Sequence, residues 1–196
     1  MAIMTLSEQV SAVGYIASLE RLLTLDAIWT AHLDGASGRQ LNADDSAALG
    51  QIADEMTQLL SQCPAAATLA HELMQRDGDS IHRMIGSAIS TLPAPPAAQD
   101  SIRVRLVTQQ GLGALISRAA EQMPAAVEAE QRDIAQKRRQ IDGGAVPPGD
   151  MSKNSLCFAG GVVLGLTTGT AIATGSVAEG LFAVYQAKEI AGECLQ

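Results

Sequence analysis

The chain has 196 residues, a formal net charge of −8 and a hydrophobic fraction of 47%. This length suits one ordinary domain with an appendage and is too short for two large domains. Because the chain is acidic and has no sustained face of Lys and Arg, we expect no nucleic-acid partner. Its three cysteines form no Cys-x-x-Cys pair, which disfavours a disulfide framework or a zinc knuckle and fits a reducing compartment.

Two helices are expected near the N-terminus. Thr5-Leu-Ser-Glu8 has the form of a capping box, and apolar residues then recur at helical spacing, which predicts one long helix ending in Asp34-Gly35. After a polar loop, Asn42 and the two acidic residues that follow it are a favourable helix start. The expected buried stripe of this second helix is Leu49, Ile52, Met56, Leu59 and Leu60.

Proline and glycine indicate where helices begin and end in the next part of the chain. Pro64 suits the first position of a helix, so we expect a short helix over residues 65–75. A turn is expected at residues 76–79, followed by a fourth apolar helical stripe as far as Leu92. The prolines within residues 93–96 end that helix, because consecutive prolines cannot continue one.

From residue 99 to residue 142 the pattern is mostly helical, with Pro124 as a kink or a restart. Residues 102–107 alternate like a strand, but a single short strand has no visible partner, so helix is expected there too. The highly charged residues 128–140 are interpreted as a solvated helix face with favourable basic residues at its end.

Residues 143–152 are rich in glycine and proline and have no periodicity, which predicts a linker. The expected organisation is therefore a helical domain over residues 1–142, the linker, and a hydrophobic glycine-zipper segment over residues 153–196. The expected fold class is all-α: a bundle-like helical domain with a C-terminal Gly-rich hydrophobic helix or helical hairpin.

The common catalytic signatures are absent from the sequence, including the nucleophile elbow, the phosphate-binding loops and the zinc-hydrolase motif. Asp79-Ser-Ile-His82 resembles half of a di-iron Glu-x-x-His motif, but that site needs two copies and further carboxylates. Cys63 and Cys157 lie among apolar or small residues, where a buried inert thiol is the default. We therefore expect no catalytic residue, cofactor or metal.

The C-terminal segment contains 25 consecutive uncharged residues, Asn154 to Ala178. As a helix, it would carry small residues on one face, because they recur every four positions. Such a ridge lets two helices approach closely in lipid. The residues expected to mediate oligomerisation or membrane contact are the ridge residues Gly161, Gly165, Gly169 and Ala173, with Phe182 and Tyr185 as an interfacial anchor.

Three interpretations of this segment remain open. Its length suits a membrane span, but its many glycines and threonines make insertion energetically marginal. A hairpin or interface helix in a soluble assembly and a flexible tail are the alternatives. For a single span, the basic residues before the run predict a cytoplasmic N-terminal domain and place Cys194 on the far side of the membrane.

The motifs identify no family, so the function is inferred from architecture. We expect a non-enzymatic, membrane-associated helical protein that acts by self-association or by binding another helical protein, as a component of a bacterial secretion or membrane assembly. The alternative is a soluble interaction module whose glycine ridge packs on a partner. A helical-bundle enzyme without a recognisable motif is the third interpretation.

Overall fold

The computed structural model describes residues 3–107, 111–176 and 194–195. These residues form an all-α fold in which no strand is present, so the expected fold class is confirmed. The helices are α1 (Leu6–Gly35), α2 (Ala43–Leu60), α3 (Cys63–Ile89), α4 (Pro96–Val107), α5 (Leu112–Asp142) and α6 (Lys153–Thr174).

The ends of the first two helices follow the predictions from sequence. Thr5 and Glu8 form the capping box, in which Glu8 N–H donates to Thr5 Oγ1 at 3.2 Å and Thr5 N–H donates to the Glu8 carboxylate at 2.7 Å. The Asn42 side chain accepts the N–H of Asp45 at 2.8 Å. These bonds satisfy donors that the first turn of a helix leaves free.

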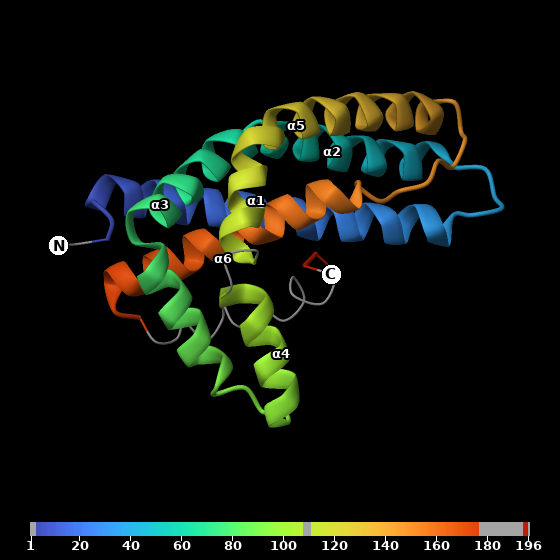
Figure 1. The fold of residues 1–196 in the computed structure, drawn as a ribbon. Helices are drawn as coiled ribbons and strands as arrows, with labels where there is room; N and C mark the ends of the chain where they lie inside the picture. The colour runs from blue at the N-terminus through green and yellow to red at the C-terminus, as the bar shows by residue number, and fades with distance from the viewer. Residues whose placement is uncertain (1–2, 108–110, 177–193, 196) are drawn as a thin grey trace.

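The predicted turn at residues 76–79 is a kink inside a single helix, α3. Asp77 alone leaves the helical region, with φ −148° and ψ 36°. One such residue changes the direction of the chain while both sides remain helical, so the two helices predicted here are two parts of α3 (Figure 1). The second part packs on α4, where Arg103 Nη2 donates to Gly86 O at 3.3 Å and to Ser90 Oγ at 3.0 Å.

Residues 102–107 are helical within α4, as predicted. Pro124 lies inside α5, which continues through it without a restart. Figure 1 shows that α5 is bent between its first and second parts. A proline inside a helix removes one backbone hydrogen bond and favours such a bend.

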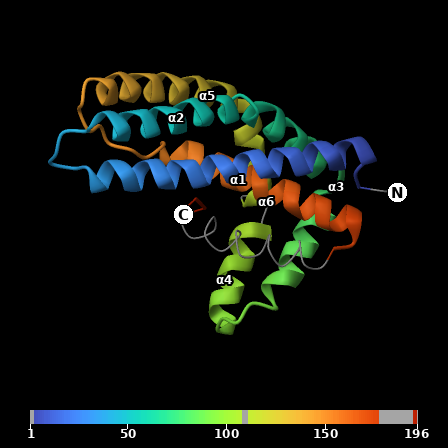
Figure 2. The same ribbon diagram turned by 180° about the vertical axis from the view of Figure 1, so that it is seen from behind.

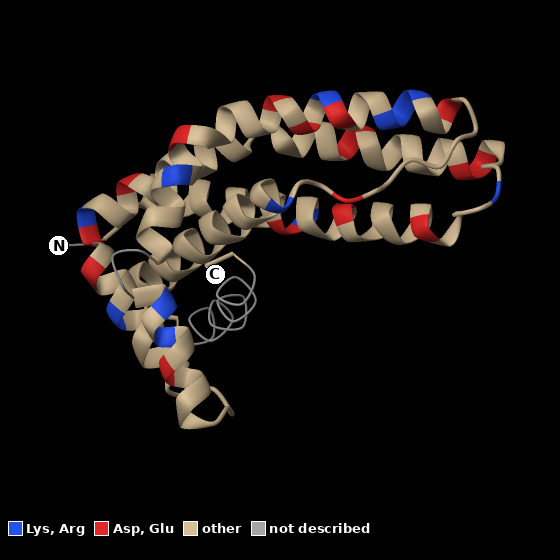
Figure 3. Cartoon of the chain, turned by 45° about the vertical axis from the view of Figure 1, so that its right-hand side comes forward, with Lys and Arg blue, Asp and Glu red and all other residues tan. Residues whose placement is uncertain are grey.

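The C-terminal described helix, α6, lies inside the bundle and packs against α1, α3 and α5 (Figures 1 and 2). After Lys153 it carries no charged residue, whereas the surrounding helices carry many (Figure 3). Its buried side chains belong to the same core as Trp29 of α1 and Leu73 of α3. Residues 1–142 and α6 thus share one core, and the division into a helical domain and a separate segment stays a prediction.

The segment 143–152 contains no helix, as expected for a linker, but it packs closely on the bundle. Pro147, Gly149 and Met151 are buried. A Cβ atom on Gly149 would come within 2.7 Å of the Thr30 backbone, so only glycine allows this close approach. The chain therefore reaches α6 along a fixed path across α1 and α5.

Candidate functional site

Three ionisable side chains are buried beside the start of α6. They are Asp26 on α1 and Glu130 and Lys137 on α5, with exposed fractions of 7%, 5% and 8%. We refer to them as the buried ionic cluster. A charged group removed from water is costly unless it is paired or hydrogen-bonded, so the partners of these side chains determine what the cluster does.

Each member of the cluster binds the chain immediately before or within the first turn of α6. Asp26 Oδ1 accepts Met151 N–H at 3.0 Å, Glu130 Oε1 accepts Ser152 N–H at 3.0 Å and the Ser155 hydroxyl at 2.8 Å, and Lys137 Nζ donates to Asp150 O at 3.1 Å. Lys137 also pairs with Asp133 at 2.7 Å. The cluster therefore fixes the position at which α6 enters the bundle.

Burial raises the pKa of Asp26 above its ordinary value. The hydrogen bond from Met151 and the charge of Lys137 act in the opposite direction, whereas the negative charges of Asp150 and Glu130 raise the pKa further. Negative charges near a buried carboxyl disfavour its ionised form. Asp26 is the member of the cluster whose protonation is most directly linked to the packing of the linker.

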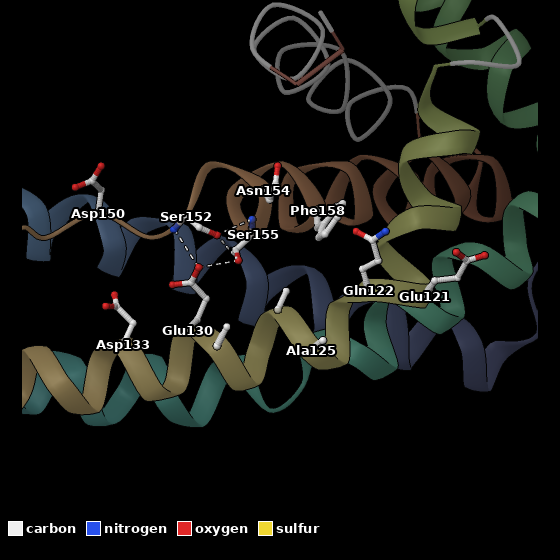
Figure 4. A pocket seen from close by; sticks show the side chains of 12 residues that line it. Glu121, Gln122, Ala125, Glu130, Asp133, Asp150, Ser152, Asn154, Ser155 and Phe158 are labelled. Atoms are coloured by element: carbon white, nitrogen blue, oxygen red, sulfur yellow. Dashed lines mark hydrogen bonds between the residues drawn. The ribbon is translucent and has the colours of Figure 1, made fainter.

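A surface groove of about 760 Å³ lies between α5 and the start of α6 (Figure 4). We call it the α5–α6 groove. Its lining is Glu121, Gln122, Ala125, Ala126, Ala129, Glu130, Asp133, Asp150, Ser152, Asn154, Ser155 and Phe158. Four of these residues are acidic and none is basic, and one of the four, Asp133, is paired with Lys137.

Carboxylates lie toward both ends of this groove. In Figure 4, Asp133 and Asp150 lie near one end and Glu121 lies near the other, with Phe158 between them. The alanines of α5 give the groove a wall of small side chains. Its volume lies within the roughly 300–1,000 Å³ of typical binding sites, although eight of its twelve lining residues are polar.

The predicted ridge residues of α6 face other helices of the same chain. A Cβ on Gly161 would come within 2.6 Å of Leu115 Cδ2, and a Cβ on Gly165 would come within 2.6 Å of Ile116 Cδ1. A Cβ on Gly169 would lie 3.3 Å from a Leu73 side-chain carbon. The three glycines thus permit close packing against α5 and α3, and their role in oligomerisation stays a prediction.

The other predicted contact residues are less informative. Ala173 is half-buried near the end of α6. Phe182 and Tyr185 lie outside the described residues. Their expected role as an interfacial anchor is therefore untested.

Cys157 and Cys194 form a disulfide, which corrects the expectations from sequence that disulfides are disfavoured and that Cys157 is a buried inert thiol. Cys157 is not a free thiol, and only Cys63 is a buried free thiol among the described cysteines. Cys157 is near the start of α6, so the chain has returned to that end by residue 194. This bond is not compatible with a single span that places Cys194 on the far side, and the topology in a membrane stays a prediction. The bond joins cysteines that are 37 positions apart, and no pattern in the sequence predicts this pairing.

The histidines do not form an evident catalytic or metal site. The Gln75 side-chain amide donates to His71 Nε2 at 2.9 Å, and the other ring nitrogen of His71 lies 3.3 Å from Ser117 Oγ. Both ring nitrogens of His71 therefore have hydrogen-bond partners within the protein. No group of three or more His, Cys, Asp or Glu within the described ranges is placed to hold a metal ion.

The sequence analysis did not single out Asp26, Glu130 or Lys137. The last two fall in the charged segment predicted to be solvated, and the first falls in the apolar first helix. One signal was available: Asp26 lies four positions after Leu22 and three positions before Trp29, on the face expected to be buried. Comparisons of the chain with protein-family models, curated proteins and solved structures found no match.

Proposed function

We propose that this protein is a non-enzymatic helical binding protein and that its α5–α6 groove holds a basic segment of a partner protein. The observation that carries this proposal is the presence, in one groove, of four acidic residues together with the alanines of α5 and Phe158. This chemistry selects an amphipathic segment whose Lys or Arg side chains reach the carboxylates while its apolar side faces the wall.

Hydrogen bonds between lining residues hold part of the groove in place. Glu130 lines it and also accepts hydrogen bonds from Ser152 and Ser155, which lie on its other side. A site whose lining residues are held by such bonds loses less conformational entropy when it binds a partner. Glu121 and Asp150 are exposed carboxylates at its rim and serve to attract and orient the partner.

The test uses a synthetic helical peptide with Lys on one face and Leu and Ala on the other, titrated into the full chain by calorimetry. We expect micromolar binding that weakens with added salt. The double variant Glu121→Gln/Asp150→Asn should weaken binding about tenfold, because each lost charge pair is worth roughly 0.5–1 kcal/mol at a partly exposed site.

The matched control is Glu72→Gln/Asp100→Asn, which removes the same charge from exposed positions on α3 and α4. It should leave the affinity unchanged. Equal weakening by both double variants would show attraction to net charge alone and overturn the proposal. Absence of binding at millimolar peptide would do the same.

Membrane association is a second candidate function, and α6 itself favours it. Lys153–Thr174 is the one described helix long and apolar enough to cross a membrane. However, 78% of its most apolar stretch is buried inside the bundle, and core helices of soluble proteins pass the same test. Insertion would require α6 to leave α1, α3 and α5, which would free the glycine ridge for contact with another copy.

Flotation of the full chain with phosphatidylglycerol vesicles tests this second function. Insertion predicts protein in the vesicle fraction that resists extraction at high salt and alkaline pH. It also predicts that Gly165→Ile weakens association within the vesicles, because a bulky side chain separates the helices. Protein that remains in the aqueous fraction would count against membrane insertion without affecting the groove.

A further inference from the structure

The disulfide between Cys157 and Cys194 ties the end of the chain to the beginning of α6. The Cα atoms of the two cysteines are 5.5 Å apart, and the C-terminal end lies beside α6 in both views of the fold (Figures 1 and 2). Cys157 is only 9% exposed, whereas Cys194 is half-buried and packs with Leu195 on the shared core. Residue 194 is therefore held at the end of α6 where the helix starts.

Beyond its first turn, α6 is held in the bundle mainly by apolar contacts. Glu130 of α5 accepts the Ser155 hydroxyl at 2.8 Å. Further along, the hydroxyls of Thr168 and Thr170 donate to backbone carbonyls of α6 itself at 2.8 Å and 2.9 Å. These two bonds stay with the helix wherever it lies. Thr167 Oγ1 is buried and has no hydrogen-bond partner among the described residues, so the place of α6 in the bundle leaves one polar group unsatisfied.

The length of α6 fixes where Cys194 would lie in a single membrane span. The helix Lys153–Thr174 has 22 residues and is therefore about 33 Å long, close to the roughly 30 Å of a hydrocarbon core. In a single span, the chain after Thr174 emerges on the far side, roughly 25 Å from Cys157. A disulfide holds its two Cα atoms within about 7 Å of each other. The Cys157–Cys194 bond and a single span therefore exclude each other.

We propose that the redox state of Cys157 and Cys194 controls whether α6 crosses a membrane as a single span. This inference rests on membrane association, the second candidate function given above. With the bond closed, both cysteines stay on one side and α6 keeps its place in the bundle. With the bond open, Cys194 is free to pass to the far side, and the hydrogen bonds of Thr168 and Thr170 persist within the inserted helix.

Opening the bond takes two electrons and two protons, which a dithiol reductant supplies. A thiolate of the reductant attacks the sulfur of Cys194, the less buried of the two cysteines. The bond between the two protein sulfurs breaks, and Cys157 leaves as a thiolate that takes up a proton. The second thiol of the reductant then attacks the mixed disulfide and releases Cys194. The reductant ends as a disulfide and the protein holds two thiols.

The experiment floats the full chain with phosphatidylglycerol vesicles, with and without dithiothreitol, and measures the share of protein that resists alkaline extraction. Reduction should move wild type from the aqueous fraction to the alkali-resistant vesicle fraction. Cys157→Ser/Cys194→Ser should enter that fraction without reductant, and dithiothreitol should not change its distribution. Cys63→Ala, which keeps the bond, is the matched control and should behave as wild type in both states. Circular dichroism before mixing establishes that each variant is folded.

The side on which Cys194 lies is measured with Cys63→Ala/Cys157→Ser, in which Cys194 is the one remaining cysteine. A membrane-impermeant thiol reagent added outside the vesicles should label it only after detergent. Labelling before detergent overturns the single span, and equal alkali-resistant shares of oxidised and reduced wild type overturn the redox control. Both of these outcomes leave membrane association in place. Protein that stays in the aqueous fraction in both redox states overturns membrane association and this inference together.

Discussion

Glu130 Oε1 accepts the backbone N–H of Ser152 at 3.0 Å, so one buried side chain of α5 fixes the residue at which α6 is capped. Ser152 in turn accepts the N–H of Ser155 at 3.2 Å. The most apolar helix of the described chain thus begins in a hydrogen-bonded polar site, where a shift of one residue would leave buried groups without partners.

Replacement of Glu130 by Ala should lower the free energy of unfolding by about 2–3 kcal/mol, because hydrogen bonds to a charged acceptor are lost and buried donors are left unsatisfied. Glu130→Gln retains one acceptor oxygen and should cost less. Chemical denaturation measures both values. The control is Glu128→Ala, at an exposed position on the same helix. A Glu130→Ala variant as stable as this control would contradict the assignment of the buried ionic cluster.

The stability contributed by Asp26 should depend on pH. Its folded-state pKa is raised by burial, so the folded protein binds more protons than the unfolded chain between the two pKa values. The contribution of Asp26 to the free energy of unfolding therefore rises as the pH falls through its folded pKa, and the rise is complete below the ordinary value of about 3.9.

Asp26→Asn removes this titration while keeping an acceptor for Met151 N–H. We expect the variant to be at least as stable as wild type at pH 7 and wild type to gain relative to it as the pH is lowered to 4. Urea unfolding at several pH values gives the difference, with Asp100→Asn as an exposed reference. A difference between wild type and Asp26→Asn that is constant with pH would refute the prediction.

Two glycines in helix interiors should respond oppositely to substitution by alanine. Gly14 has open space around its missing Cβ, so Gly14→Ala should stabilise the protein by up to about 1 kcal/mol through helix propensity. Gly161 faces Leu115, with side-chain carbons at 2.6 Å and 3.0 Å from the position of a Cβ. Overpacking there should exceed the propensity gain and destabilise by about 1–3 kcal/mol.

Thermal or chemical unfolding of the two variants measures both effects. Adding Leu115→Ala to Gly161→Ala should show a favourable coupling energy in a double-mutant cycle, because the smaller side chain makes room for the new methyl group. Stabilisation by both single alanine substitutions would mean that α6 does not pack on α5 through its glycines.

Thiol chemistry should distinguish the three cysteines. Cys63 is buried, and burial raises its pKa to about 12, so it should not react with a thiol reagent in the native protein at pH 8. Cys157 and Cys194 are bonded to each other. We expect no reactive thiol before unfolding, one after unfolding without reductant, and three after unfolding with reductant. A spectrophotometric thiol assay counts them, and three reactive thiols in unreduced, unfolded protein would contradict the disulfide.

Local signals in the sequence were sufficient for most helix ends. The side chains of Thr5, Glu8 and Asn42 bond to backbone groups within three residues, so a short stretch of sequence contains the whole interaction. The linker and the helical state of residues 102–107 followed from glycine, proline and the lack of a partner strand. The turn at residues 76–79 was misjudged, because one non-helical residue, Asp77, does not end α3. The end of α4 at Val107 and the start of α5 at Leu112 were not predicted.

The candidate site depends on contacts that are distant in sequence and could not be predicted in the same way. Asp26 and Met151 are separated by 125 positions, and Glu130 and Lys137 bond to a segment predicted to be a free linker. Charge alone favours exposure for such side chains. Burial results here from the path of residues 150–152 across α1 and α5, which only the folded chain reveals.

The position of α6 has a consequence for folding during synthesis. A ribosome produces α1, α3 and α5 before α6, yet the core that those helices share includes Leu164 and other buried residues of α6. Until the ribosome releases residues 153–174, the nascent chain exposes the apolar faces that later receive this helix. Domains generally begin to fold from the N-terminus during translation, but this core is completed only after its last described helix has emerged.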